Sequence, residues 1–278
     1  MFNGRKLIIA TKHGKEKVIA PIVEKELGVK CFVSLDIDTD ILGTFTGEIE
    51  RKDDPVASAR NKCLMAMELT NCDLAIASEG SFGPHPNLFF VPADDEILIF
   101  IDKKNGLEII VRELSAETNF NGSVINTEKN LLAFAAKANF PSHGLILRKS
   151  KEEYGEIIKG ITCAEQLIKV FTKLMNDFGT AFVETDMRAM YNPTRMKVIE
   201  NAANKLSKKI NALCPVCDMP GFSITDVKEG LPCEICNYPT RSTISYIYTC
   251  QKCNYKNEVK YPKGKKTEDP MYCDLCNP

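Results

Sequence analysis

Eight of the 12 cysteines in this 278-residue chain fall in four C-x-x-C pairs, and these pairs constrain the fold more than any other feature. They are Cys214/Cys217, Cys233/Cys236, Cys250/Cys253 and Cys273/Cys276. A C-x-x-C turn brings two thiolates to one ion, and two such turns complete a tetrahedral site. The gaps of 15 residues after Cys217 and 19 residues after Cys253 fit the spacing of zinc sites. The sequence therefore predicts two structural zinc ions, which stabilise the segment and perform no chemistry.

Two ways of sharing the pairs between the ions remain open. Sequential pairing, the simpler arrangement, joins the first pair with the second and the third with the fourth. Interleaved pairing joins the first with the third and the second with the fourth. Disulfides are disfavoured because the first residues show no signal peptide, and four redox motifs outside a βαβ pattern would be unusual. The other four cysteines, Cys31, Cys63, Cys72 and Cys163, are expected to be structural thiols.

Composition is that of an ordinary soluble globular protein, with 44% apolar and 26% charged residues. The 36 Lys and Arg against 37 Asp and Glu give a net charge of -1, which argues against a generally basic nucleic-acid binder. The longest apolar runs, such as Ile97–Ile101, are far too short to span a bilayer. We therefore expect a cytoplasmic protein with no membrane segment, divided into a domain of residues 1–210 and a zinc module of residues 211–278.

The first domain shows the alternation of strands and helices that is typical of an α/β fold. An apolar strand, Lys6–Ala10, precedes a polar turn, a helix over Glu16–Leu27 that stops at Gly28, and a strand over Val29–Val33. The acidic Asp53-Asp54 and Pro55 predict the start of a helix that ends near Leu69. Further expected elements are a strand over Leu74–Ala77 with a turn over Ser78–Pro86, hairpin strands over Ile97–Asp102 and Leu107–Arg112, helices over Glu128–Ala138, Cys163–Phe178 and Thr194–Ile210, and a strand over Leu145–Leu147.

Polar motifs at the strand ends resemble those of a known family. Ala10-Thr11-Lys12-His13-Gly14-Lys15 is similar to the Ala-Thr-x-Asn-x-x-Lys opening of the inosine/xanthosine triphosphate pyrophosphatases. The resemblance continues in the same order through Ala59-Arg60-Asn61-Lys62, Ala75-Ile76-Ala77-Ser78-Glu79-Gly80, the Asn105-Gly106 hairpin and Thr194-Arg195. The chain departs from that family in having His13 for Asn, a Lys15 one residue nearer to the Thr, and Glu79 alone in place of a paired acidic motif. The whole chain also resembles a bacterial family to which no function is attached.

The resemblance implies a mixed twisted sheet with flanking helices, a homodimer, and a Mg²⁺-dependent hydrolase that releases pyrophosphate from a free nucleoside triphosphate. Standard and non-standard bases both remain open as substrates. Glu79 would hold Mg²⁺ or orient the attacking water, and Lys15 and Lys62 would neutralise phosphate charge. The substrate-binding residues would be Thr11, His13, Lys17, Asn61 and Arg195. Without the resemblance, the three lysines would be read as solvated helix residues. His85, between two prolines, is a further polar side chain near this edge, and Arg195 has Asp186 and Glu200 as candidate ion-pair partners.

The alternative function is binding, with a catalytically degenerate nucleotide fold and zinc ribbons that recognise nucleic acid or a protein. Basic residues interleaved with tyrosines suit single-stranded nucleic acid. They are Lys252, Lys256, Lys260, Lys263, Lys265 and Lys266 with Tyr246, Tyr248, Tyr255 and Tyr261. However, eight thiolates and two zinc ions bring the segment from residue 205 onward to a net charge of about -1, which is weak for a phosphate binder. Nucleic acid is therefore the less favoured partner.

Overall fold

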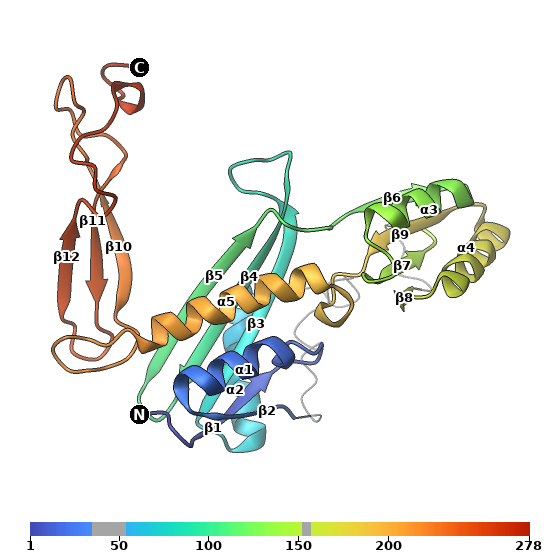
Figure 1. Ribbon diagram of the computed structural model, residues 1–278, viewed down its shortest axis with the longest axis horizontal. Coiled ribbons are helices and arrows are strands. Elements are labelled where there is room, and N and C mark those ends of the chain that lie inside the picture. Colours follow the sequence, from blue (N-terminus) through green and yellow to red (C-terminus); the bar gives the residue numbers. More distant parts are fainter. Residues whose placement is uncertain (35–53, 152–156) are drawn as a thin grey trace. The chain divides into compact units, whose positions relative to one another are not determined.

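The computed structural model describes residues 1–34, 54–151 and 157–278 (Figure 1). Across these ranges the chain is a mixed α/β protein with three sheets and five α-helices. It divides into two compact units, Met1–Ser207 and Lys208–Pro278, and the division falls inside the last helix. No helix in the described ranges combines the length and the apolar character that a membrane span requires.

A five-stranded mixed sheet in the order β2-β1-β3-β4-β5 organises the first part of the larger unit. Its strands are β1 (Lys6–Ala10), β2 (Lys30–Phe32), β3 (Leu74–Pro84), β4 (Pro92–Asp102) and β5 (Leu107–Ser115). β1 pairs in parallel with β2 and β3, whereas β3, β4 and β5 form consecutive antiparallel hairpins. Parallel pairing of β1 with β2 requires a crossover helix, and α1 (Glu16–Leu27) provides it.

Local capping chemistry sets the ends of the first two helices. α1 has the predicted bounds and ends at Gly28, whose left-handed φ of 67° lets its N–H donate to the Glu24 carbonyl. α2 (Pro55–Thr70) begins after Asp54, whose carboxylate accepts from the Val56 and Ala57 N–H groups at 2.9 and 3.1 Å. Asp53, also expected at this start, lies outside the described residues. One face of α2 packs on the sheet through Ala59, Cys63 and Ala66.

β3 is longer than its apolar run predicts. The expected turn over residues 78–86 is wrong, because β3 continues to Pro84 and remains paired with β4 as far as Pro84 opposite Pro92. The hairpin partner compensates for the weak strand propensity of this glycine- and proline-containing stretch. The hairpin around Asn105-Gly106 is confirmed, with Gly106 at a φ of 64° in the turn between β4 and β5.

A second sheet with its own core completes the larger unit. Its antiparallel order is β6-β9-β7-β8, from β6 (Gly122–Ile125), β7 (Leu145–Arg148), β8 (Ile158–Ile161) and β9 (Ala181–Thr185). Helices α3 (Glu128–Lys137) and α4 (Ala164–Phe178) cover it through a buried apolar cluster that includes Leu131, Phe171 and Val183. The expected helices and the strand at Leu145 are thus confirmed.

The last helix, α5 (Pro193–Asn211), follows β9 in the chain and packs against the five-stranded sheet. Arg195 near its start pairs with Glu96 on β4, and Lys205 pairs with Glu113 on β5. Because Glu96 and Glu113 lie opposite each other in register, both contacts fall on one face of the sheet. Fully buried Ile199, Ala203 and Leu206 form the apolar face of the helix.

The smaller unit is a three-stranded antiparallel ribbon in the order β10-β11-β12 (Figure 1). Its strands are β10 (Ser223–Glu229), β11 (Thr243–Thr249) and β12 (Lys256–Lys260). All five residues of β12 and six of the seven of β10 are exposed, so the ribbon has almost no apolar core of its own. Its stability must therefore come from the cysteine clusters at the ends of the strands.

Candidate functional site

The eight paired cysteines gather into two groups of four. Cys214 and Cys217 meet Cys250 and Cys253, and Cys233 and Cys236 meet Cys273 and Cys276. Within each group all sulfur atoms lie within 4.8 Å of one another, and the two contacts in each group are 3.6–3.8 Å long. A tetrahedron of thiolates about 2.3 Å from zinc has edges of about 3.8 Å. Each group could therefore hold one zinc ion.

The observed pairing is interleaved, and the topology of the ribbon explains it. Ser223 at the start of β10 lies opposite Thr249 at the end of β11, which places the first and third C-x-x-C pairs at the same end. Glu229 at the end of β10 lies opposite Thr243, so the second pair is at the other end, where the chain arrives after β12. Because the strands are antiparallel, alternate pairs along the chain meet.

Each C-x-x-C pair is followed directly by Asn or Asp, which is a further local signal for these turns. Asp218, Asn237 and Asn254 adopt left-handed backbone conformations with φ of 55–59°. Short polar side chains tolerate this region better than other non-glycine residues. The backbone N–H of Cys236, and to a smaller extent that of Ile235, lowers the pKa of the Cys233 thiol to about 7 against desolvation, which favours the thiolate that binds metal.

Two of the four tyrosines that are interleaved with the basic residues of the ribbon pack against a phenylalanine. Tyr248 and Tyr255 are half-buried and lie 5.7 and 5.9 Å from Phe222, between centroids. Each of the two rings therefore has one side turned towards Phe222.

A second candidate site lies where β1 ends beside β3. β1 reaches only to Ala10, opposite Ala77, so among the described residues no strand covers that edge of β3 from Ser78 onward. Open α/β sheets bind ligands at such carboxyl ends of parallel strands. Alternation along β3 sends Ser78 to one face and Glu79 to the other, where α2 packs. Polar side chains can thus approach this edge from both faces of the sheet.

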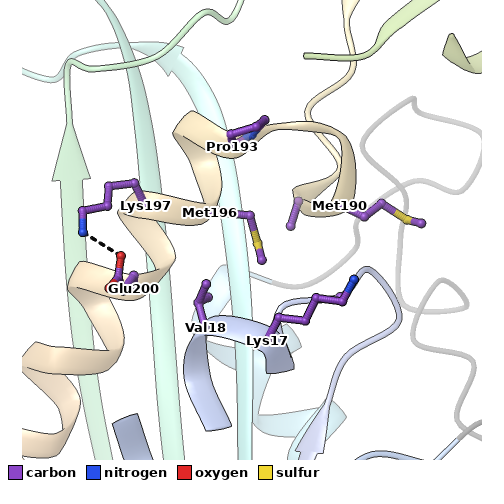
Figure 2. A pocket seen from close by; sticks show the side chains of 9 residues that line it. Lys17, Val18, Met190, Pro193, Met196, Lys197 and Glu200 are labelled. Carbon is purple, nitrogen blue, oxygen red and sulfur yellow. Dashed lines mark hydrogen bonds and ion pairs between the residues drawn. The ribbon is translucent and has the colours of Figure 1, made fainter. Parts of the chain in front are cut away.

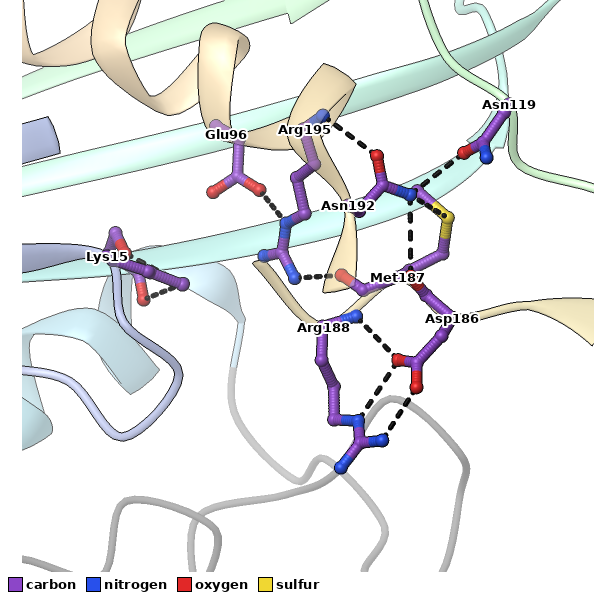
Figure 3. Close-up of polar contacts among 9 residues, drawn as sticks. Lys15, Glu96, Asn119, Asp186, Met187, Arg188, Asn192 and Arg195 are labelled. Atoms are coloured by element: carbon purple, nitrogen blue, oxygen red, sulfur yellow. Dashed lines mark hydrogen bonds and ion pairs between the residues drawn. The ribbon is translucent and has the colours of Figure 1, made fainter. Parts of the chain in front are cut away.

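Two buried lysines converge on this edge of β3. Lys15, in the turn before α1, donates from Nζ to Ser78 Oγ at 2.8 Å (Figure 3). Lys62 on α2 forms an ion pair with Glu79, and both side chains are buried. Burial, reinforced by the Arg195 charge, lowers the pKa of Lys15 to about 8, whereas Glu96, Glu79 and then Lys62 have smaller effects of mixed sign. The three residues expected to be catalytic therefore lie near one another.

Arg195 also lies in this region, but its side chain contacts other residues of the protein and is not open to solvent. Its Nε donates to Glu96 Oε1 at 2.6 Å, and another nitrogen donates to the Met187 carbonyl (Figure 3). Its guanidinium lies 5.1 Å from the Phe82 ring centroid. The side chain is 0% exposed. The two partners considered from the sequence are wrong, because Asp186 pairs with Arg188 and Glu200 with Lys197. Gly80 makes room for this pair, since a Cβ there would collide with Glu96 and Arg195.

Asp94 and Glu96, which the sequence analysis missed, belong to the same cluster of charges. Both are fully buried on β4, opposite Phe82 and Gly80 of β3. Burial, followed by repulsion from Glu96, raises the pKa of Asp94 to about 8 against the attraction of Arg195 and Lys15. An available signal was the Asp94-Asp95-Glu96 run in front of an apolar strand, because residues two apart on a strand share a face.

The remaining predicted residues lie outside the buried cluster. Thr11 Oγ1 accepts from the His13 N–H at 3.4 Å within the turn, and both residues are half-buried. Asn61 and Lys17 are exposed. His85 stabilises its own turn, since its Nδ1 accepts from the Asn87 and Leu88 N–H groups at 3.2 Å.

A cavity of about 340 Å³ opens next to the same turn, between the start of α1 and the start of α5 (Figure 2). Its lining is mostly apolar, with Val18 and Met196 on the helices and Met190 from the segment before α5. Lys17 borders it, and the Lys197–Glu200 ion pair of 2.7 Å lies on the α5 side. Gly14 in its wall directly precedes Lys15, so the cavity and the lysine share one turn.

Residues 62–278 match the protein family described as "Domain of unknown function (DUF6671)". The chain belongs to this family. The DUF6671 region contains all eight clustered cysteines and five members of the charged cluster, whereas Lys15 precedes it. These five are Lys62, Glu79, Asp94, Glu96 and Arg195. No curated protein matches the chain.

Proposed function

We propose that the larger unit is a nucleoside triphosphate pyrophosphohydrolase, in which water attacks the α-phosphorus of a free nucleotide and pyrophosphate leaves. The observation that carries the proposal is the convergence of Lys15 and of the Lys62–Glu79 pair on the uncovered edge of β3. This arrangement agrees with the motifs that resemble the inosine/xanthosine triphosphate pyrophosphatases. The fold of that family is part of the same proposal.

Each group has a chemical task in this reaction. Lys15 and Lys62 neutralise phosphate oxygens as negative charge shifts towards the leaving pyrophosphate. The turn of Thr11–Lys15 lies before the start of α1, where backbone N–H groups and the helix dipole favour anions. Glu79, released from Lys62 when phosphate binds, orients the attacking water or holds Mg²⁺. A bound Mg²⁺ supplies additional neutralisation of phosphate charge.

The neighbouring cavity provides a place for the base and sugar. At about 340 Å³ it lies within the size range of small-ligand pockets, and its methionine and valine side chains suit the faces of a base. Lys17 at its border is positioned to interact with a carbonyl oxygen of the kind that deamination introduces.

The test is pyrophosphate release from standard and deaminated nucleoside triphosphates with Mg²⁺. Glu79→Gln should lower kcat by about 10² or more, since it removes the charge that orients water. Glu108→Gln is the matched control, because Glu108 also pairs with a cation of α2, Arg60, at 2.6 Å but at the partly exposed surface. Activity in wild type that survives in Glu79→Gln contradicts the proposed role, and no release from any nucleotide contradicts the function.

A binding function of the ribbon is the second candidate, and one observation favours a protein partner. Ile235 and Leu275 occupy the same position within the two C-x-x-C pairs of one cluster and are 71% and 62% exposed. Apolar side chains at such a tip are typical of protein-binding surfaces. If the ribbon binds a protein partner independently of the larger unit, Ile235→Ser should abolish binding of that partner and Glu79→Gln should not.

A further inference from the structure

Three buried carboxylate oxygens beside the proposed catalytic centre have no hydrogen-bond donor within the described part of the chain. They are both side-chain oxygens of Asp94 and Oε2 of Glu96. Both residues are 0% exposed, so bulk water does not replace the missing donors. Buried polar groups in folded proteins are nearly always satisfied, so these oxygens call for a partner from outside the chain, such as a bound water or an ion.

Asp94 differs from the other buried carboxylates with an unpartnered oxygen. Glu113 pairs with Lys205, Glu184 pairs with Arg148, and Glu96 gives its other oxygen to Arg195. For Asp94, no ion pair or hydrogen bond reaches either oxygen from the described residues. The charges of Arg195 and Lys15 attract the Asp94 carboxylate, but neither side chain contacts its oxygens, so a cation bound directly to them would stabilise the ionised form.

The local geometry brings the three oxygens to one face of β4. Asp94 and Glu96 are two residues apart, with Cα atoms about 7 Å apart on the same face of a strand. Asp95, between them, points to the opposite face and pairs with Arg112 at 2.6 Å. Opposite Glu96, Gly80 leaves the space that the Glu96–Arg195 pair occupies, and this pairing uses Oε1 of Glu96 but not Oε2.

We propose that Asp94 and Glu96 bind one hard divalent cation, Mg²⁺ or Mn²⁺, through these three oxygens. Carboxylate oxygens without sulfur or imidazole neighbours are the ligands that such cations prefer, and Mg²⁺ keeps its other positions for water and phosphate. Lys15, Lys62 and Arg195 already balance Glu79, Glu96 and Asp94 in formal charge. A cation therefore makes the centre net positive and able to attract a triphosphate.

The catalytic role of this cation rests on the proposed function. If Asp94 and Glu96 hold the cation, Glu79 does not need to hold it. With the cation held by Asp94 and Glu96, Glu79 orients the attacking water. Cation binding itself requires no turnover, so it is measurable separately.

The experiment measures Mn²⁺ binding to the full-length, zinc-loaded protein by electron paramagnetic resonance, with Mg²⁺ as competitor. We expect one Mn²⁺ per chain, an affinity at least tenfold weaker in Asp94→Asn, and wild-type affinity in Asp95→Asn and Glu79→Gln. Asp95→Asn is the matched control because it removes a neighbouring carboxylate from the same strand. Amide NMR spectra establish that each variant is folded, and Glu96→Gln provides a second variant at the site.

Wild-type Mn²⁺ affinity in both Asp94→Asn and Glu96→Gln overturns the inference, as does a wild-type protein that binds no Mn²⁺. If Mn²⁺ binds as expected but no nucleotide is cleaved, the proposed function fails and the cation site stands. If pyrophosphate is released while both variants keep full Mn²⁺ affinity, the cation site fails and the function stands.

Discussion

The two units of this protein are stabilised in opposite ways. The larger unit buries residues 7–10 of β1 and residues 145–147 of β7 as part of its apolar interior. Of the six apolar residues buried after Ser207, four are cysteines, namely Cys214, Cys233, Cys250 and Cys273. A unit with a large apolar core can retain a cluster of buried charges, whereas a unit without one depends on metal ligands. The buried charges of the larger unit thus depend on its apolar core, and the fold of the ribbon depends on its cysteine clusters.

Removal of metal should have the largest effect of the five changes, and it should affect only the ribbon. A strong chelator should unfold the ribbon, because structural zinc supplies about 10–16 kcal/mol of apparent binding free energy in small domains. Amide NMR signals of residues after Ser207 should collapse, while those of the larger unit persist. Cys163→Ser, outside both clusters, should retain two zinc ions per chain by elemental analysis. A ribbon that remains folded without metal would show that its few apolar contacts suffice.

Paired cysteine substitutions should distinguish the interleaved arrangement from the sequential one. Cys217 and Cys250 belong to one cluster, so the double variant Cys217→Ser/Cys250→Ser should retain one zinc ion. Cys217→Ser/Cys236→Ser removes one ligand from each cluster and should lose both ions or bind them much more weakly. Sequential pairing predicts the reverse stoichiometries, so zinc content alone decides.

Disruption of the buried ion pair between Arg195 and Glu96 should destabilise only the larger unit. Arg195→Met leaves Glu96 buried without its cation and should lower the unfolding free energy by about 3–5 kcal/mol. Urea denaturation of the zinc-loaded protein measures this change. Lys197→Met, which removes an exposed cation from the same helix, should change the free energy by less than about 0.5 kcal/mol. Equal effects of the two variants would show that Arg195 is not a buried structural cation.

The buried lysine should give the larger unit a distinctive pH dependence. Burial lowers the pKa of Lys15 from 10.5 to about 8, so between these values the unfolded chain carries a proton that the folded protein lacks. Folding stability should therefore rise with pH across this window, by about 3 kcal/mol at most. Lys15→Met should lack this rise when its urea denaturation is compared with that of wild type from pH 8 to 10.5. Parallel curves for the two proteins would show that Lys15 has an ordinary pKa.

Matched valine-to-alanine substitutions should have the smallest effect on stability, and this effect should differ between the two units. Val183 is fully buried in β9, whereas Val259 in β12 is 38% exposed. Val183→Ala should destabilise the larger unit by about 2 kcal/mol, from lost burial and a residual cavity. Val259→Ala should destabilise the zinc-loaded ribbon by about 0.5 kcal/mol. A cost for Val259→Ala as large as that for Val183→Ala would indicate a hidden apolar core in the ribbon.

Some members of the charged cluster could be predicted from the sequence, and others could not. The resemblance selected Lys15, Lys62 and Glu79, which the fold brings together, although their roles remain predictions. It also selected Arg195, whose partner Glu96 is 99 residues away in the sequence. Nothing local to either residue specifies that pairing, because it depends on α5 lying over β4. Asp94 was missed for the same reason, since its burial follows from the register of β3 against β4.

Features that depend on near neighbours in the chain can be read directly from the sequence. Gly28 ends α1, Asp54 begins α2, and the C-x-x-C spacing specifies four turns that present thiolates. Tertiary structure alone decided the interleaving of those turns, the extension of β3 beyond its apolar run, and the meeting of charges on β4 and α5. The physical reason is that capping and periodicity act over a few residues. Strand register and helix packing instead join segments whose separation in the chain carries no local signal.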